Sequence, residues 1–228
     1  MFLGTLDNAK LSVNQRRQPA NLNMKLRIIP YLQRSITAVT THMAYSLKLV
    51  FDCLFSATSS HRLKQLGLFY GGCLVNKCSS TGLNAIASVL MNGLLRFLST
   101  IMAKPDEISS ASQTSMGLLQ GQLRGQTYNL LGQLASKKPD LVNANMKMLN
   151  LFFQALTQEK DDQVLQSIHE GLALLRSAYM QSGSTLPSEL QNMLIELYNS
   201  NDERRVRLNA LQCMNRLYPF HDIKARYL

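Results

Sequence analysis

A glycine-rich stretch, GLLQGQLRGQTYNLLGQLASKKP at residues 117–139, has residue types that could bind a phosphate. A phosphate-binding loop follows a β-strand and ends in Lys and then Ser or Thr, so that backbone N–H groups and an ammonium reach the phosphates. Here Arg124 lies within a helical pattern, and no strand pattern precedes it. Gly117, Gly121 and Gly125 recur every fourth residue, which places them on one stripe of a helix, where another backbone can approach closely. The stretch therefore predicts close helix packing.

Cysteine, histidine and acidic residues show no spacing typical of a catalytic or metal site. We interpret the cysteines as buried, reduced thiols because they lack paired C-x-x-C spacing, and no histidine has a local Ser or Cys partner. Paired acids stand at predicted helix starts, where capping explains them. The residues considered are Cys53, Cys73, Cys78, Cys213, His42, His61, His169, His221, Asp106/Glu107, Asp161/Asp162 and Asp202/Glu203. The sequence thus predicts no catalytic, cofactor-binding or metal-binding residue, and no enzyme.

The composition indicates a helical globular chain. Of its 228 residues, 46% are hydrophobic, Trp is absent, and alternating Val, Ile and Thr stretches are few. The first ten residues hold too short an apolar run for a signal peptide, and we expect no transmembrane segment because we count no stretch that approaches about 20 apolar residues. We therefore expect an intracellular, soluble protein.

The formal net charge of +10 is uneven along the chain. Residues 1–40 hold six Lys/Arg against one acid, residues 41–201 twelve against ten, and residues 202–228 six against three. Such an excess serves nucleic acid, an acidic protein surface or anionic lipid. Since no RNA-binding aromatic stripe, zinc-finger spacing or long basic run accompanies it, a solvated basic surface is favoured over direct nucleic-acid binding.

Four segments align without gaps and carry the most information in the sequence. Each begins with an aliphatic residue and has Leu eleven positions later, with small or apolar residues between them at helical spacing. The anchors of these segments, which we predict to form the core of the repeats, are Leu63 and Leu74, Leu123 and Leu134, Val164 and Leu175, and Val206 and Leu217.

A second apolar helix is predicted before each aligned one, over residues 39–55, 83–102, 141–157 and 186–199. Helical pairs that repeat about every 40 residues are typical of HEAT- or armadillo-like proteins. We therefore predict an all-α solenoid of about four repeats with no sheet, in preference to an irregular helical bundle. The array spans residues 24–228 with a polar insert at about 104–115, and residues 1–23 form a poorly structured basic tail.

The interhelical turns are the predicted contact surfaces. Lys137 and Lys138 follow a helix end, whereas Arg204, Arg205 and Arg207 lie near a helix start, where the helix dipole gives a cation no benefit. The lysines can cap the carbonyls of that helix end, whereas the placement of the arginines favours a contact role for them. All five residues are candidates for partner binding, although a solvated basic face is the favoured interpretation.

Residues 123–142, LRGQTYNLLGQLASKKPDLV, resemble a segment of the family of very large HEAT-repeat adaptor and scaffold proteins that associate with the 26S proteasome. MKLRIIPYLQRS, LVFDCLFSATSSHRLKQLGLFY and the ending CMNRLYPFHDIKARYL agree in the same order. The resemblance covers about residues 24–228, an internal stretch of the family's N-terminal half, as in a fragment, a truncated gene model or a short paralogue.

The resemblance implies a non-catalytic scaffold, without cofactors, that binds core and regulatory particles of the proteasome and stabilises or regulates their assembly. It also implies links to endomembranes and motor proteins, a role in ubiquitin-dependent and endoplasmic-reticulum-associated degradation, and a location in the cytoplasm, the nucleus and at endomembrane surfaces. The alternative is a basic helical-repeat module that binds nucleic acid or anionic membrane surfaces.

Overall fold

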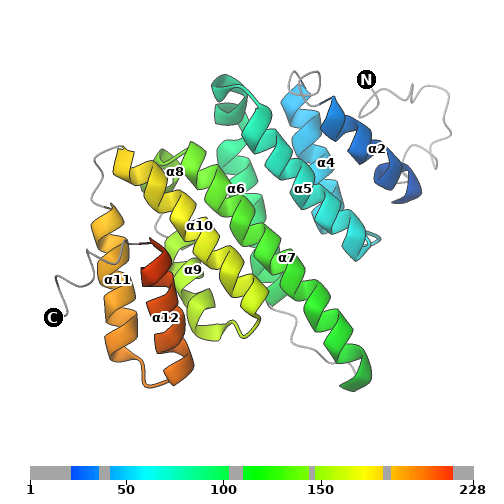
Figure 1. Ribbon diagram of the computed structural model, residues 1–228. Coiled ribbons are helices and arrows are strands. Elements are labelled where there is room, and N and C mark those ends of the chain that lie inside the picture. The colour runs from blue at the N-terminus through cyan, green and yellow to red at the C-terminus, as the bar shows by residue number, and fades with distance from the viewer. Residues whose placement is uncertain (1–21, 36–41, 103–109, 144–146, 182–185, 218–228) are drawn as a thin grey trace, which may run out of the picture. The chain divides into compact units, whose positions relative to one another are not determined.

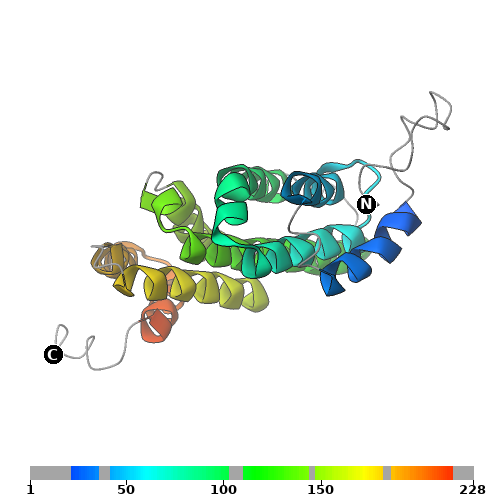
Figure 2. The ribbon, with the colours of Figure 1, turned by 90° about the horizontal axis from the view of Figure 1, so that it is seen from above.

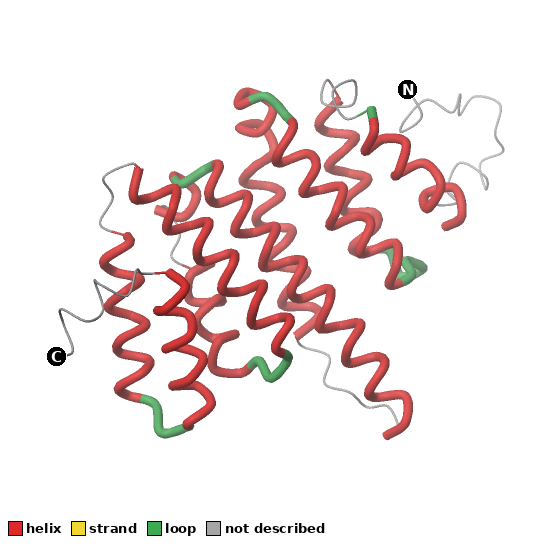
Figure 3. Tube along the Cα trace, in the orientation of Figure 1, coloured by secondary structure: helices red, strands yellow, loops and turns green. Residues whose placement is uncertain are grey.

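The computed structural model describes residues 22–35, 42–102, 110–143, 147–181 and 186–217. Within these ranges every regular element is a helix, which confirms the all-α prediction (Figures 1 and 3). The helices belong to two compact units, Met1–Pro105 and Asp106–Leu228. The predicted tail lies outside the described residues, except for its last two residues at the start of the first helix.

The first unit contains α2 (Leu22–Arg34), α4 (Met43–Phe55), α5 (His61–Lys77) and α6 (Ser80–Met102). Helix α4 packs against α5 and α6, and α2 packs against α5. The turn between α4 and α5 ends at Ser60, whose hydroxyl accepts a hydrogen bond from the Leu63 N–H at 3.3 Å. This is the N-cap that a serine before an apolar helix predicts.

Helix α2 corrects an expectation about Pro30. A proline removes one helical hydrogen bond, so the sequence predicted a break at this position. Instead α2 runs through Pro30, and Ile29 beside it is fully buried. Packing of the buried face against α5 holds the helix together where its backbone lacks a donor.

Among the described helices, α6 passes a test of length and composition for a helix that could cross a membrane. Its mean hydropathy is 1.5 over an 18-residue window. The expectation that no stretch approaches a membrane span is therefore wrong by this measure. A core helix passes the same test, and α6 has the pattern of one. Its buried side chains include Leu90, Leu94 and Leu98, whereas Asn92 and Arg96 are exposed.

The second unit contains α7 (Ser110–Lys137), α8 (Asp140–Asn143), α9 (Lys147–Gln158), α10 (Asp162–Gln181), α11 (Leu186–Ser200) and α12 (Arg204–Leu217). Helix α10 lies at the centre, in contact with α7, α9, α11 and α12. Half of the predicted polar insert, residues 110–115, is helical and extends α7 toward its N-terminus. Polar composition there does not end the helix.

The aligned repeat segments fall on α5, α7, α10 and α12, and their eight anchor residues are all buried. Exposed fractions are 3% for Leu123, 1% for Leu63, Val164, Val206 and Leu217, and zero for Leu74, Leu134 and Leu175. A helix precedes each of these four along the chain, namely α4, α6, α9 and α11. The packing within each unit is consistent with helical repeats.

Helices α7 and α10 are parallel and lie side by side (Figures 1 and 2). A Cβ atom added at Gly121 would lie 2.5 Å from Asp161 Oδ2, and one added at Gly125 would lie 3.0 Å from Ser167 Oγ. Further along, a Cβ at Gly132 would lie 2.5 Å from the Cα of Gly171 and 2.9 Å from its carbonyl oxygen. Gly121, Gly125 and Gly132 of α7 are packing positions, as the sequence predicted, and Gly132 meets backbone. The surroundings of Gly117 lie outside the described residues.

Gly171 is enclosed from a second side. A Cβ there would lie 2.7 Å from Phe152 Cε1 of α9 and 3.1 Å from the carbonyl oxygen of Tyr128 in α7. The rings of Tyr128 and Phe152 meet edge to face, with centroids 5.0 Å apart, and both side chains are fully buried. This aromatic pair and the two glycines form the centre of the second unit.

We predict that Gly132→Ala lowers the free energy of unfolding by about 2 kcal/mol, because overpacking against backbone costs roughly 1–3 kcal/mol. The gain in helix propensity, up to about 1 kcal/mol, offsets only part of this cost. Chemical denaturation of the full chain measures the difference.

Gly125→Ala is the matched control, since it has the same gain in propensity and its closest contact is the side-chain hydroxyl of Ser167 at 3.0 Å, while the nearest backbone atom, the Cα of Val164, is 3.7 Å away. Its expected change is within about 1 kcal/mol of zero. Equal stability of the two variants would show that α7 and α10 do not approach as described.

Candidate interaction surface at the interhelical turns

The five predicted contact residues lie at opposite ends of the second unit. Lys137 and Lys138 stand at the C-terminal end of α7, and the arginines stand at the N-terminal end of α12. Because α7 and α10 are parallel and Arg205 contacts the turn before α10, the lysines and the arginines are separated by the length of α10. The structure does not bring these five residues together into one surface.

The three arginines differ in their surroundings. Arg204 is exposed and forms no ion pair with a described carboxylate. Arg207 is partly exposed, and its Nη1 donates to the carbonyl of Asn201 at 3.4 Å. Lys137 is exposed and Lys138 is partly exposed. Arg204 and Lys137 therefore keep the surface exposure that a contact residue needs.

Arg205 has a function inside the chain. Its Nη1 donates to the carbonyl of Glu159, and its Nη2 donates to the carbonyl of Thr157 at 2.8 Å. These carbonyls lie at and just beyond the C-terminal end of α9, where helical acceptors lack partners and a cation is favoured. The sequence argument for a contact role fails for Arg205, because this arginine near the start of α12 caps the end of α9.

The turn at residues 157–161 also binds a side chain from α7. Arg124 Nε donates to Glu159 Oε2 at 2.9 Å and Arg124 Nη2 donates to Glu159 Oε1 at 3.1 Å, with the two side chains 20% and 10% exposed. Glu159 Oε1 also accepts from the N–H groups of Lys160 and Asp161. Such a two-pronged ion pair has a fixed geometry and is stronger than a single contact.

Two more polar contacts complete this cluster. Asp161 Oδ1 accepts from the N–H groups of Gln163 and Val164 at 2.9 and 3.3 Å, which caps α10 as the sequence predicted. Asn209 of α12 is buried, and its Nδ2 donates to the carbonyl of Leu156 at 3.2 Å. The α9–α10 turn thereby joins side chains from α7, α10 and α12. We call Arg124, Glu159, Asp161, Arg205 and Asn209 the turn cluster.

The side chains of the turn cluster hold neighbouring helices together. Both carboxylate oxygens of Glu159 and two guanidinium nitrogens of Arg205 are already used in hydrogen bonds within the chain. A general base needs a free carboxylate or imidazole within reach of a proton to be transferred. The carboxylate of Glu159 is fully engaged and that of Asp161 caps α10, so both acids of the turn cluster have structural roles.

His169 and three of the cysteines are held in their neutral forms. Burial, and then the charge of Arg216, lowers the pKa of His169 to about 4, so the imidazole is uncharged at neutral pH. The helical pattern predicts a half-buried position for His169, but the structure buries it, with 3% of the residue exposed. Burial raises the pKa of the Cys53 thiol to about 11 and also raises the pKa values of Cys73 and Cys213.

All four cysteines are free thiols, but Cys73 and Cys78 are partly exposed rather than buried. A raised pKa keeps a thiol protonated and weakly nucleophilic. Among the described residues, no group of three or more His, Cys, Asp and Glu side chains is arranged to hold a metal ion.

Sequence reasoning missed Arg124 and Glu159 as partners and Asn209 as a buried polar residue. Arg124 and Glu159 are 35 residues apart, and Asn209 and Leu156 are 53 apart. Neither contact can therefore be predicted from the spacing of nearby residues. The one available signal is the repeat alignment, which places Arg124 one position after an anchor. That position predicts proximity to the next repeat but not the identity of the partner.

The chain matches the family described as the N-terminal part of proteasome component ECM29, over residues 1–228. It is also similar to the human proteasome adapter and scaffold protein ECM29, with 27% identity over 229 residues. That alignment covers 99% of this chain and 11% of the human protein. No solved structure matches the chain.

We predict that Arg205→Gln lowers the free energy of unfolding by about 1–2 kcal/mol, since two charge-assisted hydrogen bonds to the end of α9 are lost from a partly exposed site. Arg204→Gln removes the same charge one residue earlier and is expected to change stability by less than about 0.5 kcal/mol. Denaturant unfolding at equal ionic strength compares them. Equal losses in both variants would contradict the role of Arg205 in capping α9.

Proposed function

Because the chain belongs to the family of ECM29 N-terminal regions, we propose that it is one section of a scaffold that binds the 26S proteasome. The observation that carries this proposal is the family match over residues 1–228, together with a human relative described as a proteasome adapter and scaffold. The chain spans 11% of that relative's length, so only part of the relative's contacts would lie here. The family description names a component and no reaction, in agreement with the prediction that the chain is not an enzyme.

The proposed mechanism is a helical-repeat surface that offers contact residues at its turns. Parallel helices with buried anchors and glycine contacts keep the distances between turns fixed, and a fixed surface loses little entropy when it binds. Exposed residues such as Arg204 and Lys137 are then available to a partner. Buried ones, such as Leu134 and Leu175, hold the surface in shape.

The finer roles belong to the same proposal. Binding to both the core and the regulatory particle would stabilise or regulate their assembly. Contacts with endomembranes or motor proteins would set the location of the complex in the cytoplasm, in the nucleus or at the endoplasmic reticulum. Proteasomes held at these locations would carry out ubiquitin-dependent degradation, including degradation of proteins from the endoplasmic reticulum.

The second candidate function is a basic module for nucleic acid or anionic membranes, and one observation favours it. Residues 1–105 contain twelve Lys/Arg and two Asp/Glu, whereas residues 106–228 contain twelve of each. The whole formal charge of +10 therefore falls in the first unit, and the second unit has none. Residues 202–228 still hold six Lys/Arg against three acids, but the rest of the second unit offsets that excess.

We predict that the tagged full chain captures purified 26S proteasome at about 150 mM salt after nuclease treatment, with proteasome subunits quantified by mass spectrometry. The Leu134→Asp chain keeps the basic charge but buries an unpaired carboxylate and loses its packing. Its expected capture is roughly tenfold lower, because the repeat surface and not the charge does the binding. Absence of capture, or equal capture by both chains, would contradict the proposal.

A further inference from the structure

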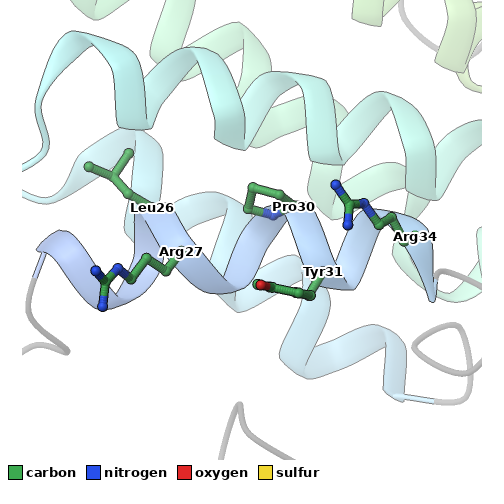
Figure 4. Close-up of a pocket in the computed structure, with 5 residues that line it drawn as sticks. All are labelled: Leu26, Arg27, Pro30, Tyr31 and Arg34. Carbon is green, nitrogen blue, oxygen red and sulfur yellow. The ribbon is translucent and has the colours of Figure 1, made fainter.

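The exposed face of α2 contains a hollow with a particular combination of side chains. Leu26, Arg27, Pro30, Tyr31 and Arg34 line a space of about 470 Å³, and all five come from this one helix (Figure 4). Arg27, Tyr31 and Arg34 are spaced at i, i+4 and i+7, which puts them on one helical face. Figure 4 shows the two arginines at opposite ends with Tyr31 and Pro30 between them.

The two arginines lack counter-charges within the described part of the chain. Neither forms an ion pair with a described carboxylate, and Asp52 is the only acid among the described residues of the first unit. The guanidinium of Arg34 lies over the ring of Tyr31, 5.8 Å from its centroid. Tyr31 itself is 68% exposed. An exposed aromatic ring between two unpaired guanidinium groups is a surface that a complementary anion can cover.

The segments adjoining α2 in sequence do not supply the anion. Residues 1–21 contain three Lys/Arg and one acid, and residues 36–41, ITAVTT, have no charge. The surrounding unit adds repulsion, because its twelve cations face two acids in total. Because the first unit has so few acids, we infer that the counter-charge comes from another molecule.

The lining favours a peptide over a phosphate polymer. Among the described residues that line the hollow, Arg27 and Arg34 are the two cations, and seven residues of helix separate their Cα atoms by about 10 Å. Single-stranded nucleic acid needs a charged groove that follows many phosphates, and an anionic membrane needs a cluster of about 4–8 cations. Leu26, Pro30 and the ring of Tyr31 instead offer apolar area that suits an apolar side chain between two acids.

Pro30 adds a backbone acceptor to the same place. It has no N–H, so the carbonyl of Leu26 lacks its usual helical donor. A peptide N–H can donate to this carbonyl while carboxylates pair with the guanidinium groups in the two-pronged geometry that arginine favours.

We propose that this hollow on α2 is a docking site for an acidic peptide segment of a protein partner, with two carboxylates about 10 Å apart and an apolar residue between them. The site goes beyond the proposed scaffold function, because it specifies the chemistry that is recognised and does not require the partner to be the proteasome. In a polyproline II peptide, residues three apart share a side and rise about 9 Å, so Glu-Pro-Leu-Glu has the required spacing.

We predict that a fluorescein-labelled peptide built on Glu-Pro-Leu-Glu binds the purified full chain at about 150 mM salt, measured by fluorescence anisotropy. The same peptide with Gln in place of both Glu is expected to bind at least tenfold more weakly, because the guanidinium partners are lost. The Arg27→Gln/Arg34→Gln chain should lose at least tenfold in affinity for the Glu peptide.

The matched control is Arg62→Gln/Lys77→Gln, which removes two exposed cations from α5 in the same unit and should lose less than threefold. Equal losses in the two double variants would overturn the site, since net charge alone would then account for binding. Two further probes are a twelve-nucleotide thymidine strand and phosphatidylserine vesicles. Binding of either probe through Arg27 and Arg34, without binding of the Glu peptide, would also overturn it and assign the arginines to phosphate.

This outcome is separate from the capture of proteasome. A chain that captures proteasome but ignores the peptide keeps the scaffold function and loses the α2 site. A chain that binds the peptide but captures no proteasome keeps the site and loses the scaffold function.

Discussion

Helices α7 and α10 run in parallel at a separation that only glycine permits at their closest point. A side-chain carbon on Gly132 would lie 2.5 Å from the backbone of Gly171, and Phe152 encloses Gly171 from the other side. Three more helices of the second unit pack around this approach, because α10 also contacts α9, α11 and α12. Glycine costs helix propensity in both helices. The burial of Tyr128, Phe152 and the leucine anchors outweighs that cost.

The charges of the two units are used differently. In the second unit, opposite charges balance, and Arg124, Glu159 and Arg205 pair inside the turn cluster. In the first unit, cations outnumber acids twelve to two, and Arg27 and Arg34 form no ion pair with a described carboxylate. Charges paired within the chain fix the spacing of the repeats, whereas unpaired exposed charges attract a complementary molecule. A scaffold needs both, because a binding surface is specific only when its support is rigid.

Much of the fold could be predicted from the sequence, because the anchors that build it recur at helical spacing. The eight aligned aliphatic residues are all buried, and the glycines of α7 do pack closely. The turn cluster could not be predicted, because Arg205 reaches carbonyls 46 and 48 residues earlier and backbone acceptors leave no mark in the sequence. The continuity of α2 through Pro30 could not be predicted for a similar reason, since burial of the neighbouring Ile29 is a tertiary effect. The division of charge between the two units becomes visible only when the chain is divided after Pro105, and polar composition alone did not predict a division between units at that residue.

Hydrogen exchange of the full chain, alone and with purified 26S proteasome, tests most directly whether the exposed turns of the repeats bind while the buried helix faces support them. We predict that amide exchange slows at the turns around Lys137 and Arg204 when the proteasome is present, while exchange in Asp162–Gln181 of α10 is unchanged because that helix is already packed on several sides. Slower exchange in α10 with no change at either turn would contradict the account.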